Sequence, residues 1–388
     1  MRKIINFAVI IVVIGLFSIP GSCTKENDDR PEFRRVVILY FAANNNLSSY
    51  AADNIENLKQ GFLPEEDSRD ILLVYSHLSG SLPRLLRLYK DEVGKIHEDV
   101  VANYESQNSA TPEVLKDMLT KVNIIFPAEE YGLLLWSHGT GWLPQGYYGN
   151  LRGFNVFMPD PYAGIVKSFA EDNGVEMEIT ELKEAIPYNL SFIIFDCCLM
   201  GGIETVYELK DKCDYIVASP TEILATGFPY DQVIRPLFKN TADLTEACQL
   251  YFDYYNNMNG VYKSATISIF QTNKLKKVAD ACKTVFNNNR SKIATLSMSS
   301  IQPYYRMDKH WFHDLADFIE SIATPSEYTA FITALDEAVI AKWTTPYFID
   351  IKIDSFSGVS TYIQNPANTY LDNFYKGFEW NKQTEMIK

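Results

Sequence analysis

Two apolar runs in the middle of the chain, residues 131–136 and 190–195, constrain the fold more than any other feature. Runs of this length and composition are typical of strands that are buried on both faces, as in parallel sheets covered by helices. His138 follows the first run, and Cys198 follows the second. Because the carboxyl ends of parallel strands meet at one edge of a sheet, we expect these two side chains to share a crevice.

Strand patterns alternate with helical patterns up to about residue 240, which predicts a mostly parallel α/β sheet with helices on both faces. The predicted strands are 34–43, 69–76, 84–89, 95–97, 131–137, 191–195 and 215–219, and the predicted helices are 48–60, 111–122, 178–185 and 202–212. Beyond this point the predicted helices are 242–256, 273–287, 313–322 and 326–342, with strand-like pieces at 265–270 and 358–363. We therefore predict a core at 34–240 and a helix-rich C-terminal subdomain at 241–388 that completes the fold.

The N-terminus has the pattern of an export signal. A positively charged start precedes a mostly apolar stretch at 4–17, which is too short to span a bilayer comfortably. Small residues then precede Cys23, as in the cleavage site of bacterial lipoproteins. We predict a lipoprotein signal peptide at 1–22, a lipid anchor at Cys23 and a flexible tether at 23–33. The expected location is the bacterial cell envelope, anchored in the outer membrane; a plain secretory signal is the alternative.

Charge and composition exclude one class of partner. The net charge is −14, whereas binding to phosphate backbones needs a basic surface, so we expect no nucleic-acid ligand. Hydrophobic residues make up 47% of the chain, which predicts a packed core.

The cysteines do not form a disulfide pattern. Once Cys23 is assigned to lipid, five of the six remain, which is an odd number. Cys197 and Cys198 are adjacent, and adjacent cysteines rarely bridge because the ring is strained. The other three, Cys213, Cys248 and Cys282, are predicted to be buried in helices, with a bridge between the first two as the alternative.

A cysteine and a histidine in one crevice can carry out nucleophilic catalysis. A thiol attacks a carbonyl as the thiolate, and a neighbouring imidazole can take its proton and return it to the leaving amine. Gly139 follows His138, and its N–H and that of Cys198 can together donate to an oxyanion. Each residue alone is more often structural, but their shared position at strand exits favours a cysteine peptidase.

Four segments resemble motifs of the clostripain family of cysteine peptidases. They are YFAANNNL at 40–47, LLWSHGTGW at 134–142, FDCCLMG at 195–201 and SGVSTYI at 357–363. The resemblance covers residues 36–363 in matching order and implies a caspase-like fold, a three-layer αβα sandwich. It also implies that His138 is the base and Cys198 the nucleophile.

Cys197 departs from the family pattern, which usually has alanine at this position. Successive side chains of a strand point to opposite faces, so only one of the two cysteines can face His138. The register of the motif selects Cys198. We expect Cys197 to be a small buried residue in place of alanine.

The resemblance also bears on substrate binding. It implies that Asp196 lies in the S1 pocket, where a carboxylate can pair with arginine or lysine; a structural aspartate that caps the next turn is the alternative. The segment 219–228 resembles the family's specificity loop, but Thr226 stands where basic-specific relatives often have aspartate. One of two pocket charges is then missing, and preference for Arg or Lys is a hypothesis.

Three other features are less specific. Asp172-Asn173-Gly174 is a candidate calcium loop, because some relatives need calcium, although an ordinary turn is the plainer interpretation and we predict no cofactor. Arg152 and Lys167 are candidate sites of self-cleavage in a long loop at 143–176. The remaining histidines, His77, His97, His310 and His313, are predicted to be structural or at the surface.

Two functions follow from these patterns. The first is an exported, lipid-anchored cysteine endopeptidase that acts on peptides or proteins. The alternative is a catalytically silent surface lipoprotein on the same scaffold that binds peptides or glycans, for which 24 Tyr and 23 Phe offer aromatic platforms. Covalent labelling of Cys198 distinguishes the two.

Overall fold

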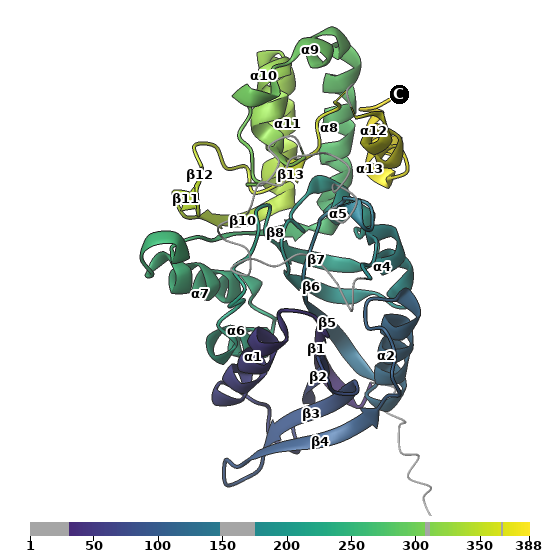
Figure 1. Ribbon diagram of the computed structural model, residues 1–388, viewed down its shortest axis with the longest axis vertical. Helices are drawn as coiled ribbons and strands as arrows, with labels where there is room; N and C mark the ends of the chain where they lie inside the picture. Colours follow the sequence, from purple (N-terminus) through teal and green to yellow (C-terminus); the bar gives the residue numbers. More distant parts are fainter. Residues whose placement is uncertain (1–30, 148–174, 307–310, 366–367) are drawn as a thin grey trace, which may run out of the picture. The chain divides into compact units, whose positions relative to one another are not determined.

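A large mixed sheet forms the middle layer of the protein (Figure 1). The computed structural model describes residues 31–147, 175–306, 311–365 and 368–388, and within them nine strands form this sheet in the order β10-β8-β7-β6-β5-β1-β2-β3-β4. The strands are β1 (Phe33–Ala43), β2 (Asp70–Leu78), β3 (Arg84–Lys90), β4 (Ile96–Asn103), β5 (Ala128–Trp136), β6 (Leu190–Asp196), β7 (Cys213–Ala218), β8 (Thr266–Gln271) and β10 (Val339–Thr344). The central strands from β7 to β2 are parallel, and the strands at both edges are antiparallel.

Burial follows the position of each strand in the sheet. Every residue of β1 from Val36 to Ala43 is buried, as expected for a central strand that is covered on both faces. The C-terminal halves of β5 and β6 are buried in the same way. By contrast, the edge strand β4 exposes most of its residues, including Val100.

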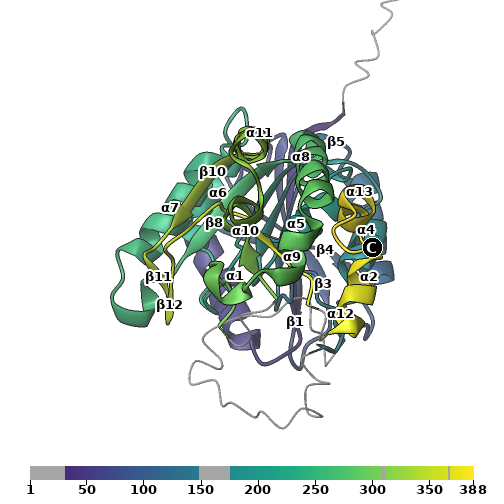
Figure 2. The same ribbon diagram turned by 90° about the horizontal axis from the view of Figure 1, so that it is seen from above.

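Helices cover both faces of the sheet (Figures 1 and 2). On one face α1, α6 and α7 lie side by side, and on the other α2, α4 and α5 do so, continued by α13, α8 and α11. These helices are α1 (Ser48–Gln60), α2 (Pro112–Ile125), α4 (Ile179–Ala185), α5 (Ile203–Glu208), α6 (Tyr230–Leu237), α7 (Leu244–Asn256), α8 (Leu275–Asn288), α11 (Pro325–Ala338) and α13 (Glu379–Thr384). The predicted αβα sandwich with a mostly parallel sheet is confirmed.

The C-terminal region contributes to this sheet and also carries short elements of its own. β8 and β10 come from this region, and β8 pairs with β7, so both parts of the chain share one sheet. The smaller elements are β9 (His313–Asp314), β11 (Tyr347–Phe348), β12 (Ile351–Lys352), β13 (Ser360–Thr361), α9 (Arg290–Thr295), α10 (Leu315–Ile322) and α12 (Thr369–Tyr375). Among the helices of the described residues, none is long and apolar enough to cross a membrane.

Two helix predictions in the C-terminal region are wrong at one end. The predicted helix at 326–342 ends at Ala338, and the chain continues as β10, because the β-branched and aromatic residues that follow pair with β8. The predicted helix at 313–322 begins at Leu315, because Asp314 is its N-cap and accepts a hydrogen bond from the Asp317 N–H. Sequence patterning does not predict α6, α9, α12 or α13.

The buried cysteines correct one further prediction. Cys248 and Cys282 lie in helices as predicted, but Cys213 lies on β7. All three are buried free thiols, so the alternative bridge between Cys213 and Cys248 is wrong.

Candidate active site

The register of β5 and β6 places the two predicted catalytic side chains. These strands are parallel neighbours, and Trp136 is paired with Asp196. His138 lies two positions after Trp136, and Cys198 lies two positions after Asp196. The structure therefore brings both residues to one edge of the sheet. The side chains are buried there, with 5% of His138 and 1% of Cys198 exposed, so charges that develop at this edge are poorly screened by water.

A residue that the sequence analysis misses orients the imidazole. Nε2 of His138 lies 2.6 Å from Oδ1 of Asn46, which follows β1, the strand on the other side of β5. Because an amide oxygen can only accept, this contact places a proton on Nε2 and leaves Nδ1 as the basic nitrogen. The sequence signal is positional: Asn46 lies just beyond a buried strand, within the segment 40–47 that resembles a motif of the family.

The Cys198 sulfur contacts the backbone of Ile223. The Ile223 N–H donates to Sγ at 3.1 Å, and the thiol donates to the Ile223 carbonyl oxygen at 3.5 Å. The next residue, Leu199, has a φ of 63°, a left-handed conformation that costs a residue with a side chain about 1–3 kcal/mol. Its N–H donates to the Thr221 carbonyl oxygen at 2.8 Å. The turn that contains Cys198 and Leu199 is therefore held sharply bent against the segment that contains Ile223.

Cys197 is buried, as the sequence predicts. It is fully buried, and its thiol donates to the Leu135 carbonyl oxygen on β5 at 3.2 Å. Cys198 has its sulfur on Ile223 instead. The two adjacent cysteines thus have different neighbours, and both lie beyond the end of β6, in the bend and turn that follow it.

Asp196 is fully buried and tied to the segment that resembles a specificity loop. Its Oδ2 accepts hydrogen bonds from the Phe228 N–H at 3.1 Å and from the Tyr230 hydroxyl at 2.7 Å. Burial, and then the charge of Asp196, raise the pKa of Tyr230 well above its usual value, so this phenol stays a proton donor at neutral pH. The carboxylate therefore lies beside the turn that contains Cys198, and one of its oxygens accepts from two donors.

Thr226 lies on the exposed part of the same loop. Its hydroxyl is 2.8 Å from the Tyr255 hydroxyl, and its carbonyl oxygen accepts from Asn54 Nδ2 at 2.9 Å. Asn54 in turn accepts from Trp136 Nε1 at 2.8 Å through Oδ1. This chain of contacts links the loop to the end of β5. Thr226 offers a neutral hydroxyl at this position rather than a carboxylate.

Glycines let the loop after β5 approach the turn that contains Cys198 and Leu199 closely. Gly139 is buried directly after His138. Gly141 has a φ of +60°, and a Cβ added there would lie 2.7 Å from the Leu199 carbonyl oxygen and 2.9 Å from the Phe312 ring. Only glycine fits this approach without displacement of a neighbour. The loops that carry His138 and Cys198 are thus in direct contact.

Several predicted features lie outside the described residues. These are the lipidation site Cys23, the cleavage candidates Arg152 and Lys167, the turn at 172–174 and His310. Of the remaining histidines, His97 pairs with Asp91 through Nε2 at 2.8 Å, and His77 Nδ1 lies 2.8 Å from the Ser109 hydroxyl. His313 is buried on β9. Within the described ranges no three His, Cys, Asp or Glu residues are grouped so as to hold a metal ion.

A parallel-centred αβα sandwich with a histidine and a cysteine at neighbouring strand exits defines a cysteine peptidase of the caspase-like class. The comparison with known families agrees: the profile of the clostripain family matches residues 39–383. The chain belongs to the clostripain family of cysteine peptidases.

Individual relatives support this placement. Over 235 residues the chain is 27% identical to clostripain of Hathewaya histolytica, a match that covers 54% of this chain and 43% of that protein, less than half of its length. An inactive zymogen of a C11 protease from Parabacteroides distasonis is 32% identical, with a TM-score of 0.79 over 91% of this chain and 98% of the other. A secreted C11 cysteine protease from Bacteroides thetaiotaomicron, solved with an irreversible peptide inhibitor, is 28% identical, with a TM-score of 0.75 over 91% and 99% of the two chains.

Proposed function

We propose that this chain is an exported, lipid-anchored endopeptidase with Cys198 as the nucleophile and His138 as the general base and acid. The observation that carries the proposal is the pairing of Trp136 with Asp196, which places both side chains at one edge of the sheet. The contact between Asn46 and His138 supplies the third, orienting group that such a nucleophile–base pair needs.

The proposed reaction is acyl transfer to sulfur followed by hydrolysis. Nδ1 of His138 takes the thiol proton, and the sulfur attacks the scissile carbonyl carbon, whose oxygen receives the electron pair. The N–H groups of Gly139 and Cys198 donate to this oxyanion, and loss of one such donor typically costs about 3 kcal/mol. The C–N bond then breaks, and the imidazolium gives its proton to the leaving amine. Water, deprotonated by His138, releases the acyl group and restores the thiol.

Asp196 is proposed as the S1 determinant for Arg or Lys. The support is its position two residues before Cys198 and its tie, through Phe228 and Tyr230, to the segment 219–228. With Thr226 in place of a second carboxylate, the pocket relies on this single charge.

Fluorogenic peptides with Arg, Lys or a neutral residue at P1 test the proposed role of Asp196. We expect Asp196→Asn to lower kcat/KM for the basic substrates by on the order of tenfold or more and to change the neutral ones less; equal rates in the wild-type protein would rule out a charged pocket.

Export and maturation are also proposed from the relatives. A relative described as secreted supports export of this chain, with acylation of Cys23 as the anchor. A relative solved as an inactive zymogen supports activation by cleavage, for which Arg152 and Lys167 are the candidates. Intact mass of the wild-type and Cys198→Ala proteins tests the second point: self-cleavage requires that only the wild type be shortened.

The adjacent cysteine supplies a matched control for the central experiment. A peptide library is digested with the wild type, Cys198→Ala and Cys197→Ala. We expect Cys198→Ala to abolish cleavage and Cys197→Ala to retain it, because only Cys198 is on the Ile223 side of the turn. An acyloxymethyl ketone should label Cys198 stoichiometrically. If Cys198→Ala still cleaves, the proposal fails; absence of cleavage and labelling in all three proteins favours the binding lipoprotein instead.

A further inference from the structure

A buried ion pair lies next to the backbone group that holds the nucleophile. Ile223, whose N–H donates to the Cys198 sulfur, is preceded by Glu222. Both carboxylate oxygens of Glu222 accept from Arg306: Nε lies 2.7 Å from Oε2, and Nη2 lies 2.9 Å from Oε1. None of the roles proposed above involves this pair.

The pair is built as a fixed structure rather than as a surface contact. The side chain of Arg306 is 2% exposed and that of Glu222 is 5% exposed. Two parallel hydrogen bonds between a guanidinium and a carboxylate fix orientation as well as distance. A buried ion pair offsets the cost of its desolvation only when its geometry is good. Removal of either partner would leave an uncompensated charge close to the neighbouring groups. The backbone of Glu222 and Ile223 therefore has little freedom.

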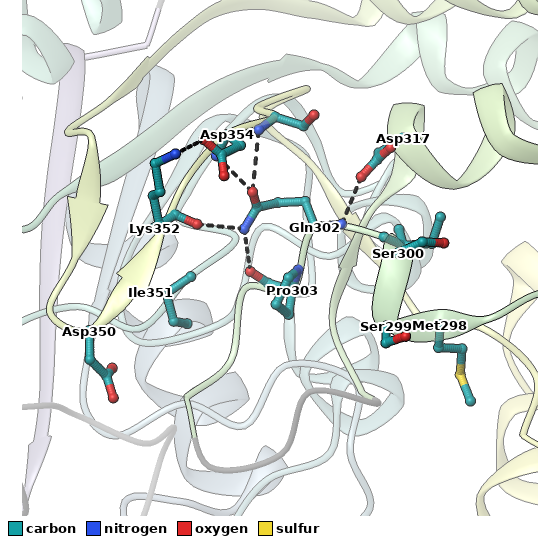
Figure 3. A pocket seen from close by; sticks show the side chains of 12 residues that line it. Met298, Ser299, Ser300, Gln302, Pro303, Asp317, Asp350, Ile351, Lys352 and Asp354 are labelled. Carbon is teal, nitrogen blue, oxygen red and sulfur yellow. Dashed lines mark hydrogen bonds and ion pairs between the residues drawn. The ribbon is translucent and has the colours of Figure 1, made fainter.

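Arg306 itself comes from a well-anchored segment. The side chain of Gln302 donates to the Lys352 carbonyl oxygen at 3.0 Å and accepts from the Asp354 N–H at 2.8 Å (Figure 3). Its own N–H donates to Asp317 at 2.7 Å. Ile301, Gln302 and Pro303 line a cavity of about 790 Å³, and Gln302 and Pro303 are seen at its wall in Figure 3.

Other titratable groups of the described residues also bear on the charge of the sulfur. Asp196 lies two residues before Cys198 on β6, and His138 lies beyond β5. From α7, Tyr251 also faces this region: burial first, and then the charges of Tyr255, Asp196 and Cys198, raise the pKa of Tyr251 well above its usual value. That phenol is therefore neutral at working pH, and Glu222 and Arg306 add a charge of each sign to the surroundings.

We propose that Arg306 and Glu222 are positioning residues for the peptidase reaction: their ion pair fixes the Ile223 N–H on the Cys198 sulfur and keeps a balanced charge beside it. This inference rests on the proposed role of Cys198 as the nucleophile. Arg306, which lies 84 positions after Glu222 in the chain, thereby affects the reactivity of the Cys198 thiol. Neither residue touches the substrate in this proposal.

The two residues carry opposite charges, so their removal should shift the pH dependence of Cys198 alkylation in opposite directions. A purely structural role would not produce such opposite shifts. Arg306→Met leaves a carboxylate next to Ile223, which disfavours the thiolate. Glu222→Gln leaves a guanidinium, which favours it. The pH midpoint for alkylation of Cys198 should therefore rise in the first variant and fall in the second, each by roughly half a pH unit or more.

The experiment uses the full chain in a Cys197→Ala background. Iodoacetamide alkylation of the peptide that contains Cys198 is followed by mass spectrometry from pH 5 to 10, together with kcat, KM and Tm. Arg35→Met is the matched control, because Arg35 is equally buried and paired with Glu130 at the other end of β1. It should lower Tm without moving the alkylation midpoint. Arg306→Lys retains the charge without the paired hydrogen bonds and should keep the midpoint while losing part of kcat.

We expect opposite shifts of the two midpoints and a fall in kcat of about tenfold for Arg306→Met, with KM changed less. Midpoints that stay at the wild-type value, or that move in the same direction, overturn the proposal even if Tm falls. If Arg306→Met does not fold, the Glu222→Gln midpoint and the Arg306→Lys kinetics decide the matter in the same way. Activity that survives Cys198→Ala is a separate result, which removes the proposed nucleophile rather than the ion pair's effect on it.

Discussion

At the scale of single residues, the bond between Asn46 and His138 decides which imidazole nitrogen carries the proton. With Oδ1 of Asn46 at 2.6 Å from Nε2, Asn46→Ala removes the acceptor that fixes the ring and its tautomer. A positioned general base contributes about 10²–10⁴-fold, and we expect loss of the orientation to lower kcat by on the order of tenfold. KM should change less than kcat, because the substitution removes a contact to the imidazole.

Asn46→Asp serves as the control for geometry. A carboxylate keeps the acceptor but favours the imidazolium, so the acid limb of the kcat profile should move to higher pH while activity at its alkaline side is retained. Stopped-flow or plate kinetics from pH 5 to 9 measure both variants. A kcat for Asn46→Ala within twofold of the wild type, at every pH, would contradict an orienting role.

These residues show which parts of the candidate site can be predicted from the sequence. The common position of His138 and Cys198 is predictable because each follows a buried strand by two residues and lies in a specific motif. Asn46 follows a strand too, but its contact depends on β1 lying beside β5 in space, although β5 comes much later in the chain. The pairing of Glu222 with Arg306 has no local pattern at all, since two charged residues far apart in sequence meet only through the tertiary fold.

At the scale of elements, the loop after β5 and the turn after β6 hold each other in place. We expect Gly141→Ala to destabilise the protein by about 2–4 kcal/mol, because it combines left-handed strain with a Cβ only 2.7 Å from the Leu199 carbonyl oxygen. Gly80→Ala is the matched control: its φ is +77°, but no atom lies within 4 Å of an added Cβ. It should therefore show the strain alone, about 1–2 kcal/mol.

Urea unfolding measures both glycine variants, and kcat separates their effects on the site. Gly141→Ala should also lower kcat, because the clash moves the loops of His138 and Cys198 apart, whereas Gly80→Ala should leave kcat unchanged. Equal destabilisation by the two substitutions would show that the loops do not press on each other.

Among the strands, sequence patterning predicts β1 and β5 because both of their faces are buried. It misses β10, where helical periodicity continues into residues that pair with β8.

At the scale of the whole molecule, the C-terminal region completes the site as well as the sheet. β7 pairs with β8, so the sheet continues from one part of the chain into the other. In the loop after β5, the Trp142 ring packs against Phe312, Tyr362 and Tyr375 of the C-terminal region, with ring centroids 6.3, 4.7 and 5.4 Å away. The sequence division at residue 240 separates two patterns of periodicity, but the hydrophobic core spans both.

We therefore expect a fragment of residues 31–240 not to fold by itself. Without the C-terminal region it would expose the hydrogen-bonding edge of β7 and the apolar ring of Trp142, both of which promote aggregation. Residues 31–388 should show one cooperative thermal transition by circular dichroism, and the fragment should show none and elute as aggregate in size-exclusion chromatography. Co-expression with residues 241–388 should restore soluble protein and labelling of Cys198. A soluble fragment with its own cooperative transition would instead establish 31–240 as an independent domain.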